Sequence, residues 1–384
     1  MNCPVTRSAI GFFLFMFFCI SISSAVVENC ESPHQSYQDR SNLTDLDLSG
    51  QNLSAVHLNR SDMRGCILDN ADLSGAYLHG SEISNAFLIK ANLTEAKMEE
   101  TSLHESDLSF ANLRRANLVL SDLFGTNLTG ADLTGADLQQ SIIREAKLVG
   151  AKLDNANLMA SNLNYSDLTY ASLIGSNMRR AILHNALLAR ANISGGSLVG
   201  ANLIYADLSR ADLRGADISE ARLFGAKFID SNMSESNVIF ANLTGTNLSR
   251  SDLSNSILRG SCFSNADMSD AILSDSDISD AELHEAIMIE AKLNRANATG
   301  VCMKGANLAR ADLSSSIIRG SCLSHANMSH ADLSDADLSD AELHEAVLTE
   351  AKLSRANASG TYMNKANLDR KSTRLNSSHE WIPR

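Results

Sequence analysis

The chain of 384 residues contains only three prolines and one tryptophan, and aromatic residues make up 5% of it. It has no basic patch with interleaved aromatic residues, the pattern typical of nucleic-acid binding, and its formal net charge is −13. It also lacks a glycine-rich loop of the kind that holds phosphate groups. These absences argue against direct nucleic-acid binding and against a nucleotide-dependent enzyme.

Motifs for metal binding and catalysis are missing as well. Two His-Glu pairs, at 284–285 and 344–345, begin like the zinc-protease motif H-E-x-x-H, but Met288 and Leu348 replace its second histidine. The cysteine spacing fits no zinc motif, and there is no EF-hand and no G-G-x-G-x-D repeat for calcium. No serine has a recognisable base and oxyanion hole. We expect no enzymatic activity, no cofactor, no metal site and no small-molecule substrate, and we interpret the His-Glu pairs as surface polar residues.

The one long apolar segment lies at the N-terminus. It runs from Ala9 to Ile22, follows Arg7, and is followed by the small residues Ser23 and Ala25. This layout is typical of a secretory signal peptide, and the segment is short for a membrane-spanning helix of about 20 residues. We predict a signal peptide at 1–25, a lead-in at 26–40 and export to the periplasm, a lumen or the cell exterior. A retained N-terminal anchor is the alternative, and no other membrane span is expected.

From Leu43 to Leu368 every fifth residue is large and apolar, except Ala298 and Ala358. Two positions before each of these lies a small residue, usually Ala or Ser, so the consensus is A-[DN]-L-x-x, as in GADLTGADLQ at 130–139. A step of five residues would spiral around an α-helix and would alternate between the two faces of a flat strand. Neither regular element buries all of these residues. The chain must therefore turn once per unit and stack its coils, so the pattern predicts a parallel β-solenoid.

This run resembles the pentapeptide repeat family, and the resemblance covers about 330 of the 384 residues. It implies an all-β fold, a right-handed quadrilateral parallel β-helix with four units per coil. The small residue and the central residue of each unit would point inward, as in Ala131 with Leu133 and Ala136 with Leu138, and the other three outward. Residues 41–370 would then form about 16 coils, in a rod about 75–80 Å long.

A longer repeat lies on top of the five-residue one. Residues 251–310 and 311–370 match at 40 of 60 positions, and SDAELHEA occurs at both 279–286 and 339–346. Sixty residues make three coils of 20 or four coils of 15, and only the family resemblance selects 20. Ala298 and Ala358 occupy the same place in the two copies, where either a void or a local narrowing of the coil is expected.

Cysteines in the repeat region fall into two groups. Cys66 takes an inward small-residue position and is expected to be buried in place of Ala. Cys302 and Cys322 take outward positions 20 residues apart, and they would be stacked neighbours about 4.8 Å apart in a coil of 20. That separation fits a disulfide, but parallel in-register side chains give the two sulfur atoms a poor approach. A Cys302–Cys322 disulfide, two free thiols and an intermolecular bond remain open.

The duplicated segment, residues 251–370, carries a net charge of about −8. We select its acidic residues as a candidate interaction surface: Asp332, Asp335, Asp337, Asp340, Glu342 and Glu345. Two interpretations compete. A solvated acidic face would keep a long rod soluble and apart from its neighbours. The family resemblance also raises a surface that mimics nucleic acid and inhibits a type II topoisomerase, although the signal peptide and the lack of a Phe-rich dimer seam argue against it.

After Arg370 the period stops, and the tail 371–384 contains the only tryptophan, Trp381. We interpret this tail as artefactual and exclude it from the fold. The overall prediction is one exported, non-enzymatic solenoid domain that acts as a structural or protein-interaction module. Its partner would be a macromolecule, in first place a protein. The resemblance makes a homodimer through a terminal coil one expected form of assembly.

Overall fold

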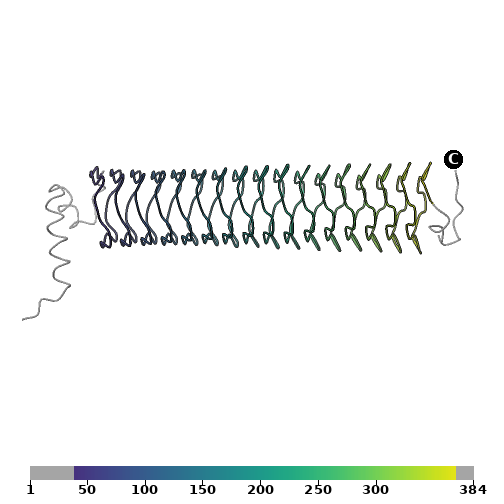
Figure 1. Ribbon diagram of the computed structural model, residues 1–384, viewed down its shortest axis with the longest axis horizontal. Coiled ribbons are helices and arrows are strands. Elements are labelled where there is room, and N and C mark those ends of the chain that lie inside the picture. The colour runs from purple at the N-terminus through teal and green to yellow at the C-terminus, as the bar shows by residue number, and fades with distance from the viewer. Residues whose placement is uncertain (1–38, 369–384) are drawn as a thin grey trace, which may run out of the picture.

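The computed structural model describes residues 39–368, which wind into a straight rod with its coils stacked along the long axis (Figure 1). The second residue of each five-residue unit forms a parallel bridge with the residue 20 positions later, from Asn42 with Asp62 to Val347 with Asn367. A coil therefore holds 20 residues in four sides, and a coil of 15 is excluded. Residues 39–368 contain no helix, and no strand longer than one bridged residue. Their length corresponds to about 16 coils.

A tight turn closes every unit. The amide of the next unit's first residue donates to the carbonyl of the central residue, as in Ala131 N to Leu128 O at 3.0 Å. Every fifth-position residue from Asp45 to Lys365 has a positive φ, near +60°. This combination is a type II turn, which requires a left-handed residue at its third position. Many of these residues are not glycine, and such a conformation costs about 1 kcal/mol for an ordinary side chain. Stacking of the coils must supply that energy at each corner.

The inward side chains form one continuous apolar column. Ala131 and Leu133 are both fully buried, and the same two positions are buried in nearly every unit, as the sequence pattern predicted. Cys66 is buried too, and this burial raises the pKa of its thiol to about 11. Ala298 is buried, whereas Ala358 is partly exposed in the last described coil.

Serines at the small inward position satisfy their hydroxyl groups with main-chain carbonyls. Ser81 Oγ donates to Leu58 O at 2.6 Å in the preceding coil, and Ser141 Oγ donates to Leu138 O at 2.6 Å within its own coil. Because a buried hydroxyl without a partner is costly, these bonds explain why Ser replaces Ala without loss of the fold.

The Asp or Asn before the central residue holds the turn together. Asp132 Oδ1 accepts a hydrogen bond from the main-chain amide of Thr134 at 3.0 Å, and Asn92 Nδ2 donates to Asp72 Oδ1 in the adjacent coil at 2.9 Å. Such a side chain mimics a backbone turn, and it also forms a ladder between coils. The sequence analysis assigned this position only an outward direction, and its structural role accounts for the [DN] in the consensus.

Some predictions lie outside the described residues: the signal peptide at 1–25, most of the lead-in at 26–40, and the tail at 371–384. Within residues 39–368, no helix is long and apolar enough to cross a membrane.

Candidate functional site: the outward columns

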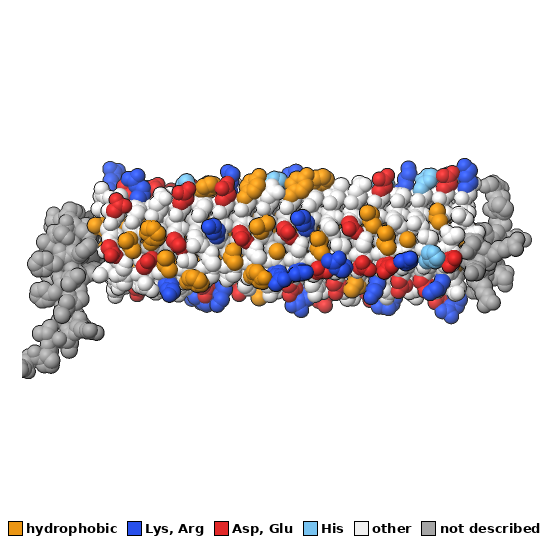
Figure 2. All heavy atoms as spheres, viewed as in Figure 1, with side chains coloured by type: hydrophobic (Ala, Val, Ile, Leu, Met, Phe, Trp, Pro, Cys, Tyr) orange, Lys and Arg blue, Asp and Glu red, His pale blue; other side chains and the backbone are white. Residues whose placement is uncertain are grey.

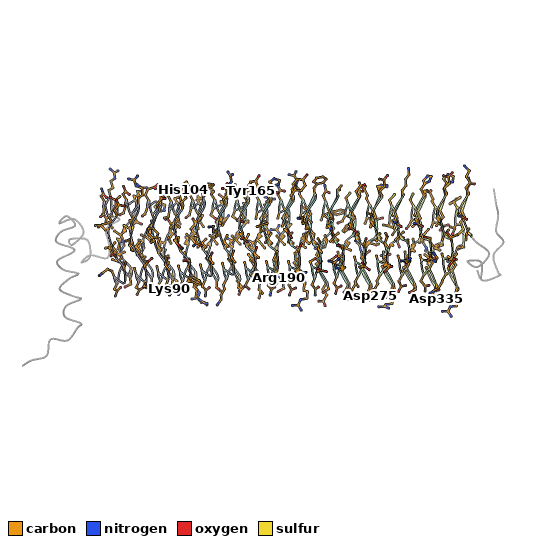
Figure 3. The ribbon with its side chains drawn as sticks, in the orientation of Figure 1. Lys90, His104, Tyr165, Arg190, Asp275 and Asp335 are labelled. Atoms are coloured by element: carbon orange, nitrogen blue, oxygen red, sulfur yellow. The ribbon has the colours of Figure 1, made fainter. Side chains whose placement is uncertain are left out.

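The 20-residue coil places outward side chains in columns parallel to the rod axis. Two residues of each turn project at a corner, so the four corners carry four double columns. We call one of them the His104 corner; it contains the turn residues at 104–105 and those at every 20-residue step before and after. Figure 3 places His104 and Tyr165 along one edge of the rod, and Asp275 and Asp335 along the other.

The middle of the His104 corner carries a stack of aromatic rings. Tyr165 meets His184 with ring centroids 5.9 Å apart, His184 meets Tyr205 at 5.9 Å, and Tyr205 meets Phe224 at 5.6 Å. All three contacts are edge-to-face, a favoured arrangement of aromatic pairs. Tyr165 and Tyr205 are each 52% exposed. Figure 2 shows hydrophobic side chains gathered along the middle of this edge.

Glycine in the next coil lets a corner aromatic lie flat against the rod. A Cβ atom at Gly225 would lie only 2.5 Å from Tyr205 Cε1, and Gly130 and Gly260 have the same relation to Phe110 and Phe240. The exposed rings are therefore held in fixed orientations before any partner binds.

The sequence analysis missed this stack because the four residues are far apart in the chain and low in number. Their spacing was the available signal: residues 165, 184, 205 and 224 follow one another in steps of 19, 21 and 19. In a coil of 20, such steps alternate between the two turn residues of a single corner.

The acidic residues selected from sequence wind around successive sides of one region, but they do not form a free acidic surface. Four of the six are paired with cations at short distance: Arg319 with Asp337 at 3.1 Å, Lys352 with Asp332 at 3.0 Å, Arg355 with Asp335, and Lys365 with Glu345 at 3.1 Å. Asp340 and Glu342 have no ion pair within residues 39–368. Because most of these carboxylates are neutralised by a neighbouring coil, the region is less suited to mimicking nucleic acid than its composition indicates.

These pairs also affect titration. Hydrogen bonds from Arg355 hold the pKa of Asp335 below its ordinary value. The equivalent pair in the first copy behaves the same way, because hydrogen bonds from Arg295 lower the pKa of Asp275.

Cys302 and Cys322 are bridged neighbours in adjacent coils, and both are free thiols. Burial raises the pKa of Cys302, so its reactive thiolate form is disfavoured. The Sγ atom of Cys302 also lies 3.8 Å from His284 Nδ1. The disulfide between these two cysteines stays a prediction.

The fold and its five-residue columns define a class, the pentapeptide-repeat β-helices. The description of pentapeptide repeats matches segments that together run from residue 41 to residue 370. The chain therefore belongs to the pentapeptide repeat family, and its fold is the family's right-handed quadrilateral β-helix.

Several solved structures of the same family are similar to this chain. HetL, a protein involved in heterocyst differentiation regulation from Nostoc sp. strain PCC 7120, is 31% identical, with 58% of this chain and 89% of HetL covered and a TM-score of 0.28. Full-length QnrB1, a plasmid-mediated fluoroquinolone resistance protein, is 18% identical, covering 52% of this chain and 92% of QnrB1 at a TM-score of 0.36. A protein of the Arabidopsis thaliana thylakoid lumen is 24% identical, covering 33% and 66% at a TM-score of 0.14. No curated protein sequence matches.

Proposed function

We propose that this protein is an exported, non-enzymatic module that binds a partner protein through the aromatic middle of its His104 corner. The supporting observation is the stack formed by Tyr165, His184, Tyr205 and Phe224, in which most of the rings are about half exposed. Aromatic side chains dominate the energetic centres of protein interfaces because they bury a large area with few rotatable bonds.

The rod supplies the second half of the mechanism. Bridges at every 20 residues fix the columns, so a partner meets rings whose positions change little on binding. Preorganised rings lose little conformational entropy in the complex, which favours affinity. A partner with its own periodic surface would also engage several coils at once, and avidity would follow from the spacing alone.

A photo-crosslinking residue at position 205 tests the partner surface. The matched control is the same residue at Glu235, which lies on the diagonally opposite corner and in the same left-handed turn conformation. We expect position 205 to capture one discrete protein from the compartment in which the chain resides, and position 235 to capture none. Tyr165→Ser together with Phe224→Ser should then abolish the crosslink at 205. Equal capture at both positions would contradict the proposal.

Export is tested separately, by cell fractionation and N-terminal sequencing of the full chain made in a secretion-competent host. A mature start at Val26 in the exported fraction is expected. An unprocessed cytosolic product would remove export and would turn attention to the second hypothesis, an inhibitor of a type II topoisomerase that mimics nucleic acid. A DNA supercoiling assay with gyrase would then be the direct test, although the paired carboxylates argue against that outcome.

A further inference from the structure

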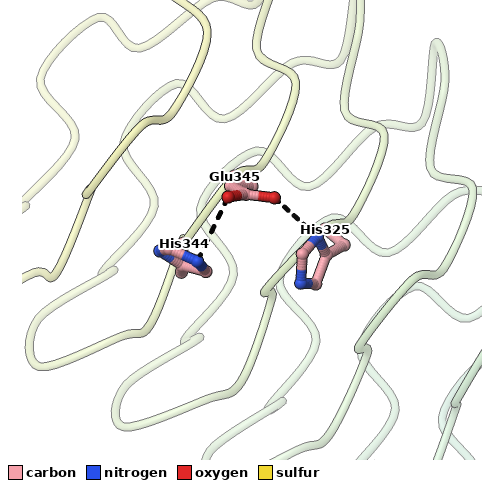
Figure 4. Close-up of side chains that lie close together, drawn as sticks. All are labelled: His325, His344 and Glu345. Atoms are coloured by element: carbon pink, nitrogen blue, oxygen red, sulfur yellow. Dashed lines mark ion pairs between the residues drawn. The ribbon is translucent and has the colours of Figure 1, made fainter.

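At the C-terminal end of the His104 corner, two imidazoles converge on one carboxylate (Figure 4). His325 Nδ1 lies 3.4 Å from Glu345 Oε2, and His344 Nε2 lies 3.5 Å from Glu345 Oε1. The ligand-type atoms of all three residues lie within 4.8 Å of one another. We propose that His325, His344 and Glu345 form a binding site for a divalent transition metal ion, with Zn²⁺ as the best fit.

The distances match those of a zinc site. Zinc binds histidine nitrogen and carboxylate oxygen at about 2.0–2.1 Å, so two ligands on a tetrahedral ion lie about 3.3–3.4 Å apart. Both histidine-to-glutamate distances already have this value. Only the two imidazoles need to approach each other further, from the T-shaped arrangement in which their centroids are 5.7 Å apart. Two nitrogen ligands and one carboxylate favour zinc and similar metals over calcium or magnesium, which prefer oxygen alone.

The site is accessible and its carboxylate is ready to bind. The side chains of His325 and His344 are 49% and 41% exposed, so the rings can rotate and an ion can enter from solvent. A hydrogen bond from Lys365 holds the pKa of Glu345 below its ordinary value, so the carboxylate is charged at neutral pH. Lys365 Nζ occupies Oε1 at 3.1 Å, and an incoming cation would displace it.

The sequence analysis missed this site because it looked for the second histidine three residues after Glu345. His325 instead comes 20 residues before Glu345, one coil away in space. The first copy of the duplication has His284 and Glu285 at the equivalent places, but it has Asn265 where the second copy has His325. One chain therefore contains both a three-ligand corner and a two-ligand version of it.

Calorimetric titration of the folded full chain with ZnCl₂ tests the proposal, with Co²⁺ absorption spectra as a second readout of nitrogen coordination. His325→Asn converts the second copy into the first and should weaken Zn²⁺ binding at least tenfold. Asparagine tolerates the left-handed turn conformation of this corner, so the variant should fold. Asn265→His builds the missing ligand into the first copy and should raise the stoichiometry by one ion.

The matched control is His330→Asn. His330 lies on the neighbouring corner, is equally exposed and is paired with Glu350 at 3.3 Å, but no second histidine belongs to that cluster. This variant should bind Zn²⁺ like the unaltered chain. The proposal is overturned if the unaltered chain binds no Zn²⁺ at millimolar concentration, or if His325→Asn and His330→Asn change the affinity equally.

Discussion

The two copies of the duplication, residues 251–310 and 311–370, differ mildly inside and strongly outside. Buried differences exchange one apolar side chain for another: Leu258 for Ile318, Phe263 for Leu323, Ile278 for Leu338, and Met288 for Leu348. Outward differences change the chemistry: Asn265 becomes His325, Ile272 becomes Asp332, and Gly305 becomes Lys365. The coil thus constrains volume at its inward positions and leaves the outward columns free to acquire new properties, since a close-packed interior tolerates only similar volumes.

The largest expected effect tests the claim that both cores are equivalent. Leu253 and Leu313 are fully buried at the same place in the two copies. Each change to Ala should lower the free energy of unfolding by about 3 kcal/mol, because it removes buried apolar contacts and leaves a cavity. Since three coils separate the sites, the double variant should show the sum. Urea unfolding measures all three, and a difference of more than about 1 kcal/mol between the copies would break the comparison.

A smaller effect is expected at the corner where the copies differ in glycine. Gly305 has a φ of +70°, and Lys365 occupies the same turn position with a φ of +57°. Gly305→Lys should therefore destabilise the first copy by about 1 kcal/mol, because a side chain is disfavoured in this conformation. An added Cβ would meet Glu285 Cγ at 3.4 Å, an ordinary contact, so crowding is not the cause.

The reciprocal change, Lys365→Gly, serves as the control for that experiment. It relieves the backbone but removes the ion pair with Glu345, so its gain should be smaller than the loss at Gly305. Thermal unfolding of both variants gives the comparison. A loss of stability in both would show that the lysine itself, rather than the turn conformation, is decisive.

The smallest expected effect concerns the ion pairs that the two copies share. Arg295 contacts Asp275 and Arg355 contacts Asp335, each through two hydrogen bonds, and all four side chains are well exposed. Exposed pairs contribute little, so Arg295→Gln and Arg355→Gln should each produce a small and equal fall in melting temperature at neutral pH.

The pH dependence of this effect has a definite sign. Both aspartates have lowered pKa values in the folded chain, so their stabilisation is present above the unfolded pKa of about 3.9. It is lost as the pH falls through the lower folded value. Melting curves of the variants and the unaltered chain should therefore converge in acid. A difference that persists at pH 2 would show that the arginines act through packing instead of charge.

Much of the fold could be predicted from sequence, because Leu133 and Ala131 belong to a period that no helix or flat strand can bury. The choice between coils of 15 and 20 residues could not be made from spacing, since 60 residues fit both. Hydrogen bonding decided it, through bridges such as that of Cys302 with Cys322. The family resemblance had already pointed to the same answer.

The candidate sites were less accessible to sequence reasoning. The acidic composition of the second copy was correct, but the partners of Asp332 and Asp335 lie one coil later, so their neutralisation was not foreseen. Tyr205 and His325 each acquire a role from residues about 20 positions away. Once the coil length is known, such relations can be sought along the sequence in steps of 19, 20 and 21.

The bridges between coils run parallel to the axis of the rod, and this has a mechanical consequence. A force that pulls the two ends apart loads these hydrogen bonds in tension one coil at a time, and no side of the rod is crossed by a longer strand that could share the load. Each coil that peels away releases 20 residues, or about 65 Å of extended chain, in exchange for about 4.8 Å of rod. Stretched from its ends, the protein should therefore lengthen in many equal, low-force steps, as an extensible tether does, while it remains stiff against bending.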